Sequence, residues 1–419
     1  MLPALNHADI QPQDRAVPLC PHFGSCGGCQ LQHLNYTAQL RKKAIRVRTL
    51  LEASGLALHE LHLHPSPPFA YRNRIRLSLA EVNGALHAGY LTPAPKEPSN
   101  RLPRTSNLIF LPITECPIAA PILWRAAEAF IALLNQSPDI WLRNSHPIPD
   151  QLELFTTADE SRLQLTLYLR TAIKTLPKAL TVGYAALFKE LCTSIPELTG
   201  AGIVILPPLS VQLSRRTEVS RSGLAWGAPG LTYTVEHFQP RTLNLERQIY
   251  WVPREAFFQI NRFLLPELLG LVINNSTGQL SFDLYAGVGL FSRALAAQYT
   301  HVTAVEIAGP SFTALASTKL SNLLAIKATT LQFLRSAVLQ RDRPDLIVLD
   351  PPRSGAGTEV CTLLARIAAP TLIYVSCSPE TLTADLVALT AAGYSLTELH
   401  LLDIFPQTTH IETVTVLTR

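Results

Sequence analysis

The sequence is poor in charged residues and contains no long hydrophobic run. Charged residues make up 16% of the 419 residues and hydrophobic residues 47%, which excludes a disordered chain because disorder requires low hydrophobicity and high charge. No window of about 18 residues is apolar and uncharged, so no membrane-spanning helix is expected. The N-terminus lacks a basic segment followed by an apolar one, which argues against a secretory signal. These absences predict a soluble, cytoplasmic protein without membrane contact.

Cysteine is also scarce, but its distribution is uneven. Three of the seven cysteines crowd together near the N-terminus: Cys20, Cys26 and Cys29. In a reducing compartment such clustering indicates a metal or catalytic site rather than disulfides. Three thiolates need a fourth ligand to complete a zinc or iron–sulfur site, and Cys116, which precedes a proline, is the candidate. The spacing alone leaves zinc and iron–sulfur equally open. Cys192 and Cys361 lie in apolar, helical contexts and are expected in the core.

The chain divides into three parts by pattern. We predict an N-terminal cysteine loop over residues 1–35, a central α+β domain over 36–250 and an α/β domain over 251–419. Residues 36–54 predict a helix with a basic face, and the alternating segment 71–91 predicts a hairpin that turns at Asn83-Gly84. From about residue 255, short apolar runs alternate with helical stretches, which is typical of a parallel sheet covered by helices.

Ligands of such sheets bind at the carboxyl ends of the strands, so the residues that follow each strand are candidates. The run 280–286 leads into a Gly-x-Gly turn (287–289), and the next strand ends about twenty residues later at Glu306, where an acidic side chain can bind ribose hydroxyls. Ser292 stands where the dinucleotide pattern has its third glycine, which favours S-adenosylmethionine over NAD. The turn alone is a weak signal, and the turn and Glu306 together leave a nucleoside cofactor and a purely structural role equally open.

Two further strand ends carry reactive side chains. The run 345–350 ends in Asp-Pro-Pro-Arg (350–353), and two prolines can continue neither a strand nor a helix, so they make a rigid exit toward the cleft. The run 371–376 ends at Cys377, where a thiolate could face a ligand, although a lone cysteine is more often buried in a core. Glu412 begins the last apolar strand, a position where a solvated side chain is the ordinary interpretation.

In order and spacing, these segments resemble the RNA (uracil-5-)-methyltransferase family, which methylates uridine in ribosomal and transfer RNA. The resemblance covers most of the chain and rests on FFQIN at 257–261, DLYAGVG at 283–289, Glu306, DPPRSG at 350–355, SCSPET at 376–381 and HIETV at 410–414. It implies a Rossmann-like class I methyltransferase domain with a mostly parallel sheet. The cysteine run is similar to that of the family's iron–sulfur branch, whose members often act on 23S rRNA.

The resemblance assigns roles to individual residues. Cys377 is expected to add to carbon 6 of uracil, which activates carbon 5, and Glu412 to remove the carbon 5 proton. The S-adenosylmethionine contacts fall on Gln259, Tyr285, Glu306 and Asp350, with orientation of the uracil as an alternative role for Asp350. The cysteines expected to hold a [4Fe–4S] cluster, in a loop that packs on the catalytic domain, are Cys20, Cys26, Cys29 and Cys116.

The sequence departs from the family at three positions. Leu290 replaces a common Asn, Ser378 replaces a common Asn, and Ala384 replaces a common Arg. These changes weaken individual contacts but leave the expected nucleophile and base in place, so we expect an active enzyme.

Basic residues suggest where RNA binds. Arginine and lysine groups suit phosphate contacts, which supply affinity rather than sequence specificity. The basic residues expected to contact RNA are Arg41, Lys42, Lys43, Arg46, Arg48, Arg72, Arg74, Arg76, Arg101 and Arg104.

We predict 23S rRNA as the substrate and no obligate protein partner. Only 19 residues precede Cys20, too few for the extra barrel domain of many relatives, so tRNA is the alternative. A non-catalytic iron–sulfur RNA-binding protein is the alternative from another class, against which Cys377 and Glu412 together argue.

Overall fold

The computed structural model describes most of the chain. The described ranges are 11–57, 60–93, 108–136, 149–173, 175–208, 221–239, 244–273, 276–307 and 309–419. They form two compact units that are both discontinuous in sequence. Unit 1 comprises Met1–Ala16, His33–Pro68 and Thr232–Arg419, and unit 2 comprises Val17–Gln32 and Phe69–Leu231. The sequence pattern alone suggests contiguous parts with borders near 35 and 250.

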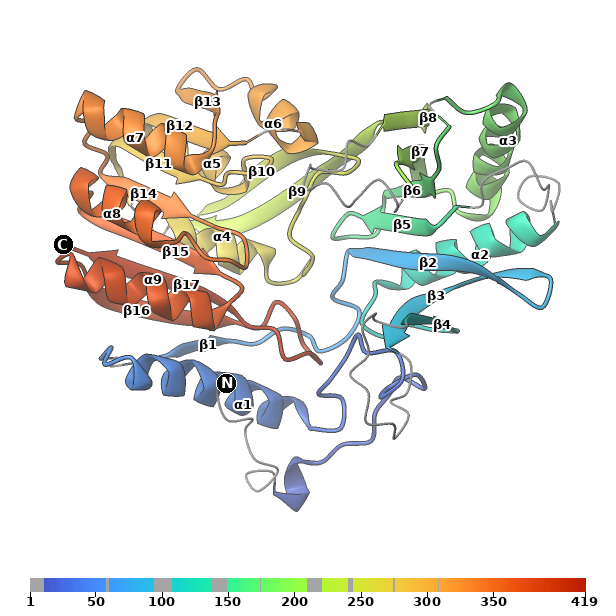
Figure 1. Cartoon of the computed structure of the whole chain (residues 1–419), viewed down its shortest axis with the longest axis horizontal. Coiled ribbons are helices and arrows are strands. Elements are labelled where there is room, and N and C mark those ends of the chain that lie inside the picture. Colours follow the sequence, from blue (N-terminus) through green and yellow to red (C-terminus); the bar gives the residue numbers. More distant parts are fainter. Residues whose placement is uncertain are drawn as a thin grey trace. The chain divides into compact units, whose positions relative to one another are not determined.

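Unit 1 is built around an eight-stranded sheet with the order β1-β16-β17-β15-β14-β11-β12-β13 (Figure 1). Neighbouring strands run parallel except at β17, which is antiparallel to β15 and β16. The strands are β1 (His62–His64), β11 (Gly278–Leu284), β12 (Tyr299–Glu306), β13 (Leu323–Lys327), β14 (Leu346–Leu349), β15 (Thr371–Ser376), β16 (Ser395–Leu402) and β17 (Glu412–Thr418). The predicted α/β fold with a mostly parallel sheet is therefore confirmed.

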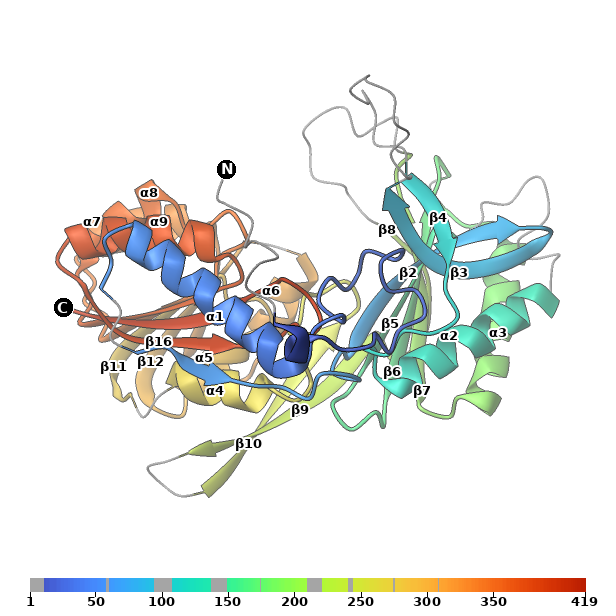
Figure 2. The ribbon, with the colours of Figure 1, turned by 90° about the horizontal axis from the view of Figure 1, so that it is seen from below.

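Helices cover both faces of this sheet. Figure 2 shows α1, α7, α8 and α9 on one face and α4 and α5 on the other. The first group shares one apolar core with the sheet, a cluster that contains Leu51, Phe333, Leu364 and Leu386 of these helices. The helices of this unit are α1 (Tyr36–Ala53), α4 (Leu265–Ile273), α5 (Leu290–Leu295), α6 (Gly309–Ala316), α7 (Thr330–Gln340), α8 (Thr358–Ile367) and α9 (Pro379–Ala391).

Three smaller elements complete this part of the chain. The 3-10 helix η2 (Pro12–Asp14) precedes α1, and β9 (Gly230–Gln239) and β10 (Asn244–Pro253) pair as a separate two-stranded ribbon. Helix α1 begins where the sequence predicts because the Asn35 side chain accepts a hydrogen bond from the Ala38 amide at 2.9 Å, which caps its N-terminus. None of the helices in the described ranges is long and apolar enough to cross a membrane.

Unit 2 is an α+β layer, in line with the central domain that the sequence predicts. Its seven-stranded sheet has the order β4-β3-β2-β5-β6-β7-β8, and α2 and α3 pack on it through Phe130 and Phe188. The predicted hairpin is confirmed, since Asn83 and Gly84 have φ of 53° and 79° and join β2 to β3. The elements are β2 (Arg74–Val82), β3 (Ala85–Pro93), β4 (Leu108–Pro112), α2 (Pro121–Gln136), β5 (Gln151–Thr156), β6 (Leu163–Arg170), α3 (Lys178–Ser194), β7 (Leu198–Leu206) and β8 (Arg221–Gly227).

Candidate functional site

The turn after β11 is shaped for the close approach of a ligand. Tyr285, Gly287 and Gly289 all have positive φ, of 63°, 57° and 89°. A Cβ built on Gly289 would lie 2.8 Å from Leu315 Cδ1, so a larger residue would disturb the packing there. At Gly287, by contrast, a Cβ would meet no described atom within 4 Å, so the backbone faces open space. A turn with such open space beside it, at the start of a helix, is a place where a nucleoside can lie against the backbone.

Glu306 is fixed beside this turn. Its carboxylate accepts a hydrogen bond from the Gly287 amide at 2.9 Å and another from the Ile307 amide at 3.0 Å. The pairing of β11 with β12 brings the two strand ends together. The structure therefore unites Tyr285 and Glu306, two of the four residues expected to contact S-adenosylmethionine. Gln259, the third, is 6% exposed in the segment after β10.

The fourth expected contact, the half-buried Asp350, lies in a group of carboxyls with the buried Asp283 and Glu412. Burial raises the pKa of Asp283 to about 7, although a hydrogen bond from the Ser292 hydroxyl opposes the rise. Burial and the nearby Asp283 charge also raise the pKa of Asp350 to about 7. Glu412 is 3% exposed; burial first, and then the Asp350 charge, raise its pKa well above the ordinary value. Glu412 is thus no solvated strand-end residue.

Cys377 and Arg353 complete this group. Burial raises the pKa of the Cys377 thiol, and the charges of Glu412 and Asp350 raise it further. The Arg353 guanidinium acts in the opposite direction, because it hydrogen-bonds the sulfur and attracts the thiolate. Arg353 lowers the pKa of Glu412 in the same way. The structure therefore brings Asp350, Cys377 and Glu412 together from the ends of β14, β15 and β17, with one cation among them.

The sequence predicts that Arg353 lies at the cleft but assigns no function to this residue. It assigns no function to Asp385 either. The carboxylate of Asp385 in α9 accepts hydrogen bonds from the Tyr374 hydroxyl at 2.6 Å and from the amides of Ala356 and Gly357 at 2.8 and 3.1 Å. Gly355 fits the turn only as glycine, since a Cβ there would lie 2.8 Å from Asp385 Oδ2. Asp385 thereby fixes the loop that follows Arg353. An aspartate among the apolar residues of α9 was the available signal.

Replacing Asp385 with alanine is expected to lower the free energy of unfolding by about 3 kcal/mol, because three donors around the loop would lose their acceptor. Chemical denaturation followed by circular dichroism measures the change. Glu52→Ala is the matched control, since Glu52 is exposed near the end of α1 and a surface change of this kind alters stability by about 0.5 kcal/mol or less. Equal stability of the two variants would contradict the role given to Asp385.

The three departures from the family pattern lie near the same strand ends. Leu290 is the first residue of α5, and its carbonyl accepts a hydrogen bond from the Tyr250 hydroxyl at 2.9 Å. The Ser378 amide donates to the Ser376 hydroxyl at 3.2 Å directly before α9. Ala384 precedes the buried Asp385. The contacts of Leu290 and Ser378 are made by their backbone atoms, so they form without the asparagine that is common in the family. The hydrogen bonds of Asp385 likewise form without an arginine at position 384.

The basic helix expected to bind RNA is largely engaged within the protein. Lys43 is 2% exposed and its Nζ lies 2.5 Å from Asp403 Oδ1, so the prediction that it contacts RNA is wrong. A helical pattern could not reveal a partner 360 residues away. Arg41 pairs with Asp14, and Arg46 with Glu380.

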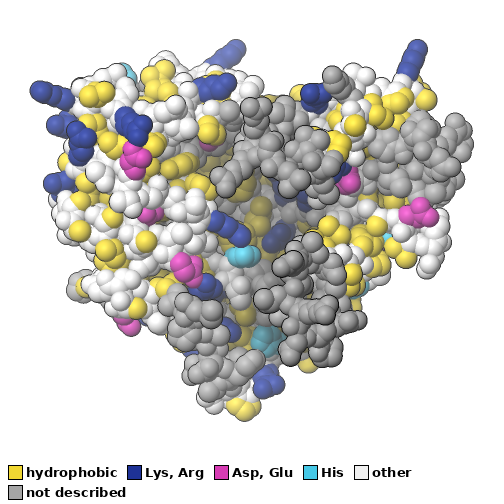
Figure 3. All heavy atoms as spheres, in the orientation of Figure 1, with side chains coloured by type: hydrophobic (Ala, Val, Ile, Leu, Met, Phe, Trp, Pro, Cys, Tyr) yellow, Lys and Arg dark blue, Asp and Glu magenta, His cyan; other side chains and the backbone are white. Residues whose placement is uncertain are grey.

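The strand arginines also have partners inside unit 2. The Arg74 guanidinium lies 4.1 Å from the Phe155 ring centroid, and Arg76 donates to Glu153 at 2.6 and 2.9 Å. Arg101 and Arg104 lie outside the described residues. In Figure 3, Lys and Arg side chains are visible over unit 1 as well, including the region of α7 and α8. The basic surface is therefore not confined to the N-terminal segments.

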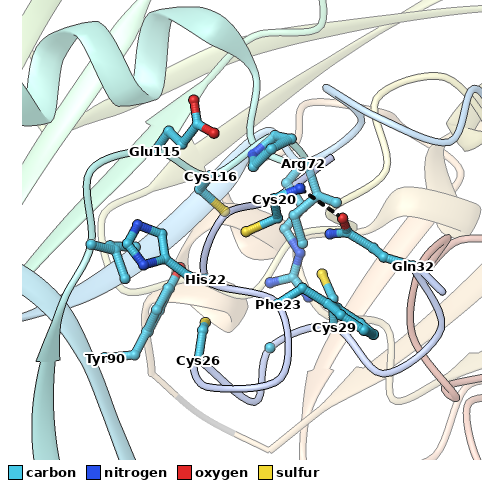
Figure 4. Close-up of a pocket in the computed structure, with 14 residues that line it drawn as sticks. Cys20, His22, Phe23, Cys26, Cys29, Gln32, Arg72, Tyr90, Glu115 and Cys116 are labelled. Atoms are coloured by element: carbon cyan, nitrogen blue, oxygen red, sulfur yellow. Dashed lines mark hydrogen bonds between the residues drawn. The ribbon is translucent and has the colours of Figure 1, made fainter. Parts of the chain in front are cut away.

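The four clustered cysteines line a single pocket in unit 2 (Figure 4). Cys20, Cys26 and Cys29 come from the loop 17–32, and Cys116 from the segment after β4. The imidazole of His22 ties the two segments together, because its Nε2 lies 3.0 Å from both the hydroxyl and the amide of Thr114. The sequence suggests that this loop packs on the catalytic domain, but the structure groups it with residues 69–231.

The pocket combines half-buried thiols with a half-buried cation. Burial raises the pKa of Cys116 to about 11 and also raises the pKa values of Cys26 and Cys29. Arg72 lines the same pocket, and its Nε is buried without a hydrogen-bond partner among the described residues. In the described ranges no three His, Cys, Asp or Glu side chains are arranged as they stand to hold a metal ion.

Known proteins similar to this chain are RNA methyltransferases. The family model described as tRNA (Uracil-5-)-methyltransferase matches residues 236–419. An uncharacterized RNA methyltransferase of Listeria innocua is 27% identical, with 99% of this chain and 87% of the relative covered. One from Thermotoga maritima is 28% identical, with 98% and 86% covered. The crystal structure of Pyrococcus abyssi tRNA (uracil-54, C5)-methyltransferase with S-adenosyl-L-homocysteine has the same fold, at a TM-score of 0.65, 22% identity and coverage of 94% of this chain and 86% of that one.

These similarities indicate an RNA methyltransferase, which is the enzyme class that the sequence predicts. Within this class, residues 236–419 are similar to the tRNA (Uracil-5-)-methyltransferase family model. The matched segment contains the glycine turn, Glu306, Asp350, Cys377 and Glu412.

Proposed function

We propose that the protein methylates carbon 5 of a uridine in 23S rRNA through a covalent bond between Cys377 and the base. One observation carries the proposal. Cys377, Asp350 and Glu412 lie together at adjoining strand ends beside the exposed Arg353, and Glu412 is buried while the other two are half-buried. The charges of this group shift the pKa values of Cys377 and Glu412. A thiol, a proton acceptor and a cation are the groups that addition to uracil and later elimination require.

The residues at the glycine turn fit S-adenosylmethionine. The open space beside Gly287 leaves room for a nucleoside, and the Glu306 carboxylate is held at the rim where ribose hydroxyls can be bound. Gln259, Tyr285 and Asp350 would complete the contacts. When bound, S-adenosylmethionine supplies a methyl group on a sulfonium, which is open to attack by a carbon nucleophile.

The protein's own side chains prepare that nucleophile. The Cys377 thiolate adds to carbon 6 of the uracil, which makes carbon 5 electron-rich, and Arg353 favours the thiolate form. After carbon 5 has gained its methyl group, Glu412 removes the carbon 5 proton, the double bond re-forms and the thiolate leaves. A carboxylate whose pKa is raised by burial is a stronger base than an exposed one, which suits Glu412 to this step. The target uridine must leave its stack to reach Cys377.

The RNA substrate can be identified in cells. In a strain that lacks this gene, 23S rRNA is expected to lose one 5-methyluridine while tRNA keeps its own, as measured by nuclease digestion and mass spectrometry of each RNA. A second candidate is tRNA, because the matched family and the similar enzyme of Pyrococcus abyssi are both named for it. Loss of the modification from tRNA alone would establish that candidate, and unchanged RNA would overturn the proposed activity.

We also propose that Cys20, Cys26, Cys29 and Cys116 hold a [4Fe–4S] cluster. The support is that all four line one pocket, and that the buried Arg72 Nε in its wall has no other partner among the described residues. A cubane bound by four thiolates is anionic, so a guanidinium in the wall suits it. Since Cys116 as a thiol has a pKa of about 11, the metal would also be what keeps its sulfur deprotonated.

Anaerobically purified protein is therefore expected to be brown and to contain about four irons per chain, as measured by elemental analysis and visible absorption. Cys116→Ser should reduce the iron content, whereas Cys192→Ser, which alters a cysteine outside the pocket, should not. A colourless protein with one zinc per chain would refute the cluster and favour the tetrahedral zinc site that the spacing also allows.

A further inference from the structure

The loop between β16 and β17 (403–411) is unusual because most of it is buried. Asp403, Ile404, Gln407 and Thr408 are each 3% exposed or less. Connecting segments normally run over the surface, where water satisfies their backbone groups. Gln407 also adopts a left-handed backbone conformation, with φ of 68°, which a residue with a side chain rarely does. A buried, strained loop persists only if its surroundings hold it in place.

Helix α1 makes many of the contacts that fix the loop in place. Lys43 donates to Asp403 Oδ1 at 2.5 Å and to the Phe405 carbonyl at 2.9 Å. Four residues earlier on the same helix face, the Gln39 side chain donates to Gln407 Oε1 at 2.9 Å and accepts from the Gln407 amide at 3.0 Å. These contacts join segments more than 350 residues apart within unit 1.

A third contact comes from a different direction. Asn261, which is fully buried, donates to the Ile404 carbonyl at 3.1 Å and to the Ser66 hydroxyl at 2.9 Å. Its own side-chain oxygen accepts from the amides of Phe263 and Leu264 at 3.0 and 3.1 Å, so the amide group is fixed. The start of the loop is thus held from two sides.

The position of this loop sets the position of Glu412. Glu412 is the first residue of β17, directly after the loop, and it pairs with Leu402 of β16. Asp403, the residue that Lys43 binds, follows Leu402 in the chain. A shift of the loop relative to α1 would therefore move the Glu412 carboxyl relative to Cys377 and Asp350.

We propose that Lys43 and Gln39 are positioning residues that hold Glu412 in place for proton removal, through Asp403 and Gln407. The inference rests on the proposed function, in which Glu412 acts after the covalent bond to uracil has formed. Loosening the loop slows that late step, while RNA and S-adenosylmethionine bind as before. The methylated protein–RNA adduct consequently accumulates, which a general loss of stability would not cause.

The test compares full-length variants by steady-state kinetics and by the amount of adduct seen on denaturing gels with labelled methyl groups. Lys43→Met removes the hydrogen bonds from Lys43 to Asp403 and Phe405. Gln407→Gly removes the hydrogen bond from Gln39 to Gln407 Oε1. Gln407→Gly is expected to fold, since glycine adopts a positive φ without strain. Thermal unfolding identifies any variant that fails to fold. Glu412→Gln is the positive control for the adduct. Arg335→Met is the matched control, because the Arg335–Glu359 pair between α7 and α8 is exposed.

We expect Lys43→Met and Gln407→Gly to lower kcat by about tenfold or more, a size typical of small displacements of a reacting group. KM for RNA should fall with kcat, because slowing a step after methyl transfer leaves kcat/KM unchanged. Adduct should rise above the wild-type level, while Arg335→Met behaves as wild type. Adduct in Glu412→Gln but none above wild type in Gln407→Gly would overturn this inference alone. Absence of adduct in Glu412→Gln would overturn the role of Glu412 as base, and this inference with it.

Discussion

Cys377→Ala is expected to abolish RNA methylation, with a loss of turnover on the order of 10⁴-fold or more. Carbon 5 of uracil is a poor nucleophile until a thiolate has added to carbon 6, and alanine has no group that can add. Transfer of labelled methyl groups to RNA transcribed without modifications measures the effect. The variant should still bind S-adenosylmethionine, because its expected contacts at the glycine turn and at Glu306 do not involve the sulfur.

The control for this prediction is Cys192→Ala, which removes a thiol of unit 2 that donates a hydrogen bond to the Leu198 carbonyl at 3.3 Å. Its turnover should match that of the wild type. Undiminished turnover in Cys377→Ala would refute the covalent mechanism. The RNA would then have to be methylated by a route that needs no sulfur adduct.

Arg353→Gln is expected to shift the acid limb of the pH profile of kcat/KM upward by about one pH unit, the size typical for loss of one nearby opposite charge. The guanidinium lowers the pKa values of both Cys377 and Glu412. Without it both groups stay protonated to higher pH, so activity at neutral pH falls and recovers as the pH rises. Methylation rates at low RNA concentration, measured across the pH range, give the profile.

Arg353→Lys keeps the charge and should leave the acid limb near its wild-type position. Arg343→Gln removes an exposed arginine whose guanidinium donates to the Asp342 carbonyl, and it should have no effect on the profile. If Arg353→Gln merely lowered the rate equally at every pH, electrostatic activation of the thiol by Arg353 would be contradicted.

The sequence predicted best those features that depend on residues close together in the chain. Strand ends that carry Gly-x-Gly, Asp-Pro-Pro-Arg and Ser-Cys lie together because the carboxyl ends of parallel strands share one edge of a sheet. The Asn83-Gly84 turn and the start of α1 at Asn35 are likewise determined by neighbouring residues. These features needed no knowledge of the tertiary structure.

Prediction failed where a side chain's surroundings come from distant segments. Lys43 has the sequence context of a solvated basic helix, yet its partner Asp403 is near the other end of the chain. The grouping of the loop 17–32 with unit 2, between two segments of unit 1, likewise depends on contacts between distant segments. Asp385 was overlooked for this reason as well, since the amides that it binds lie in a loop before α8.

The discontinuity of unit 1 has a consequence for synthesis on the ribosome. Helix α1 and strand β1 are made early, but β16, β17 and Asp403, which they contact, are among the last residues to emerge. Until the C-terminal residues have been made, Lys43 lacks its partner Asp403 and the apolar face of α1 is exposed to solvent. Exposed apolar surface favours association with other chains. A fragment consisting of residues 236–419 would show the converse defect, with β16 as an open sheet edge. Adding a separate peptide that spans residues 33–68 should restore its solubility.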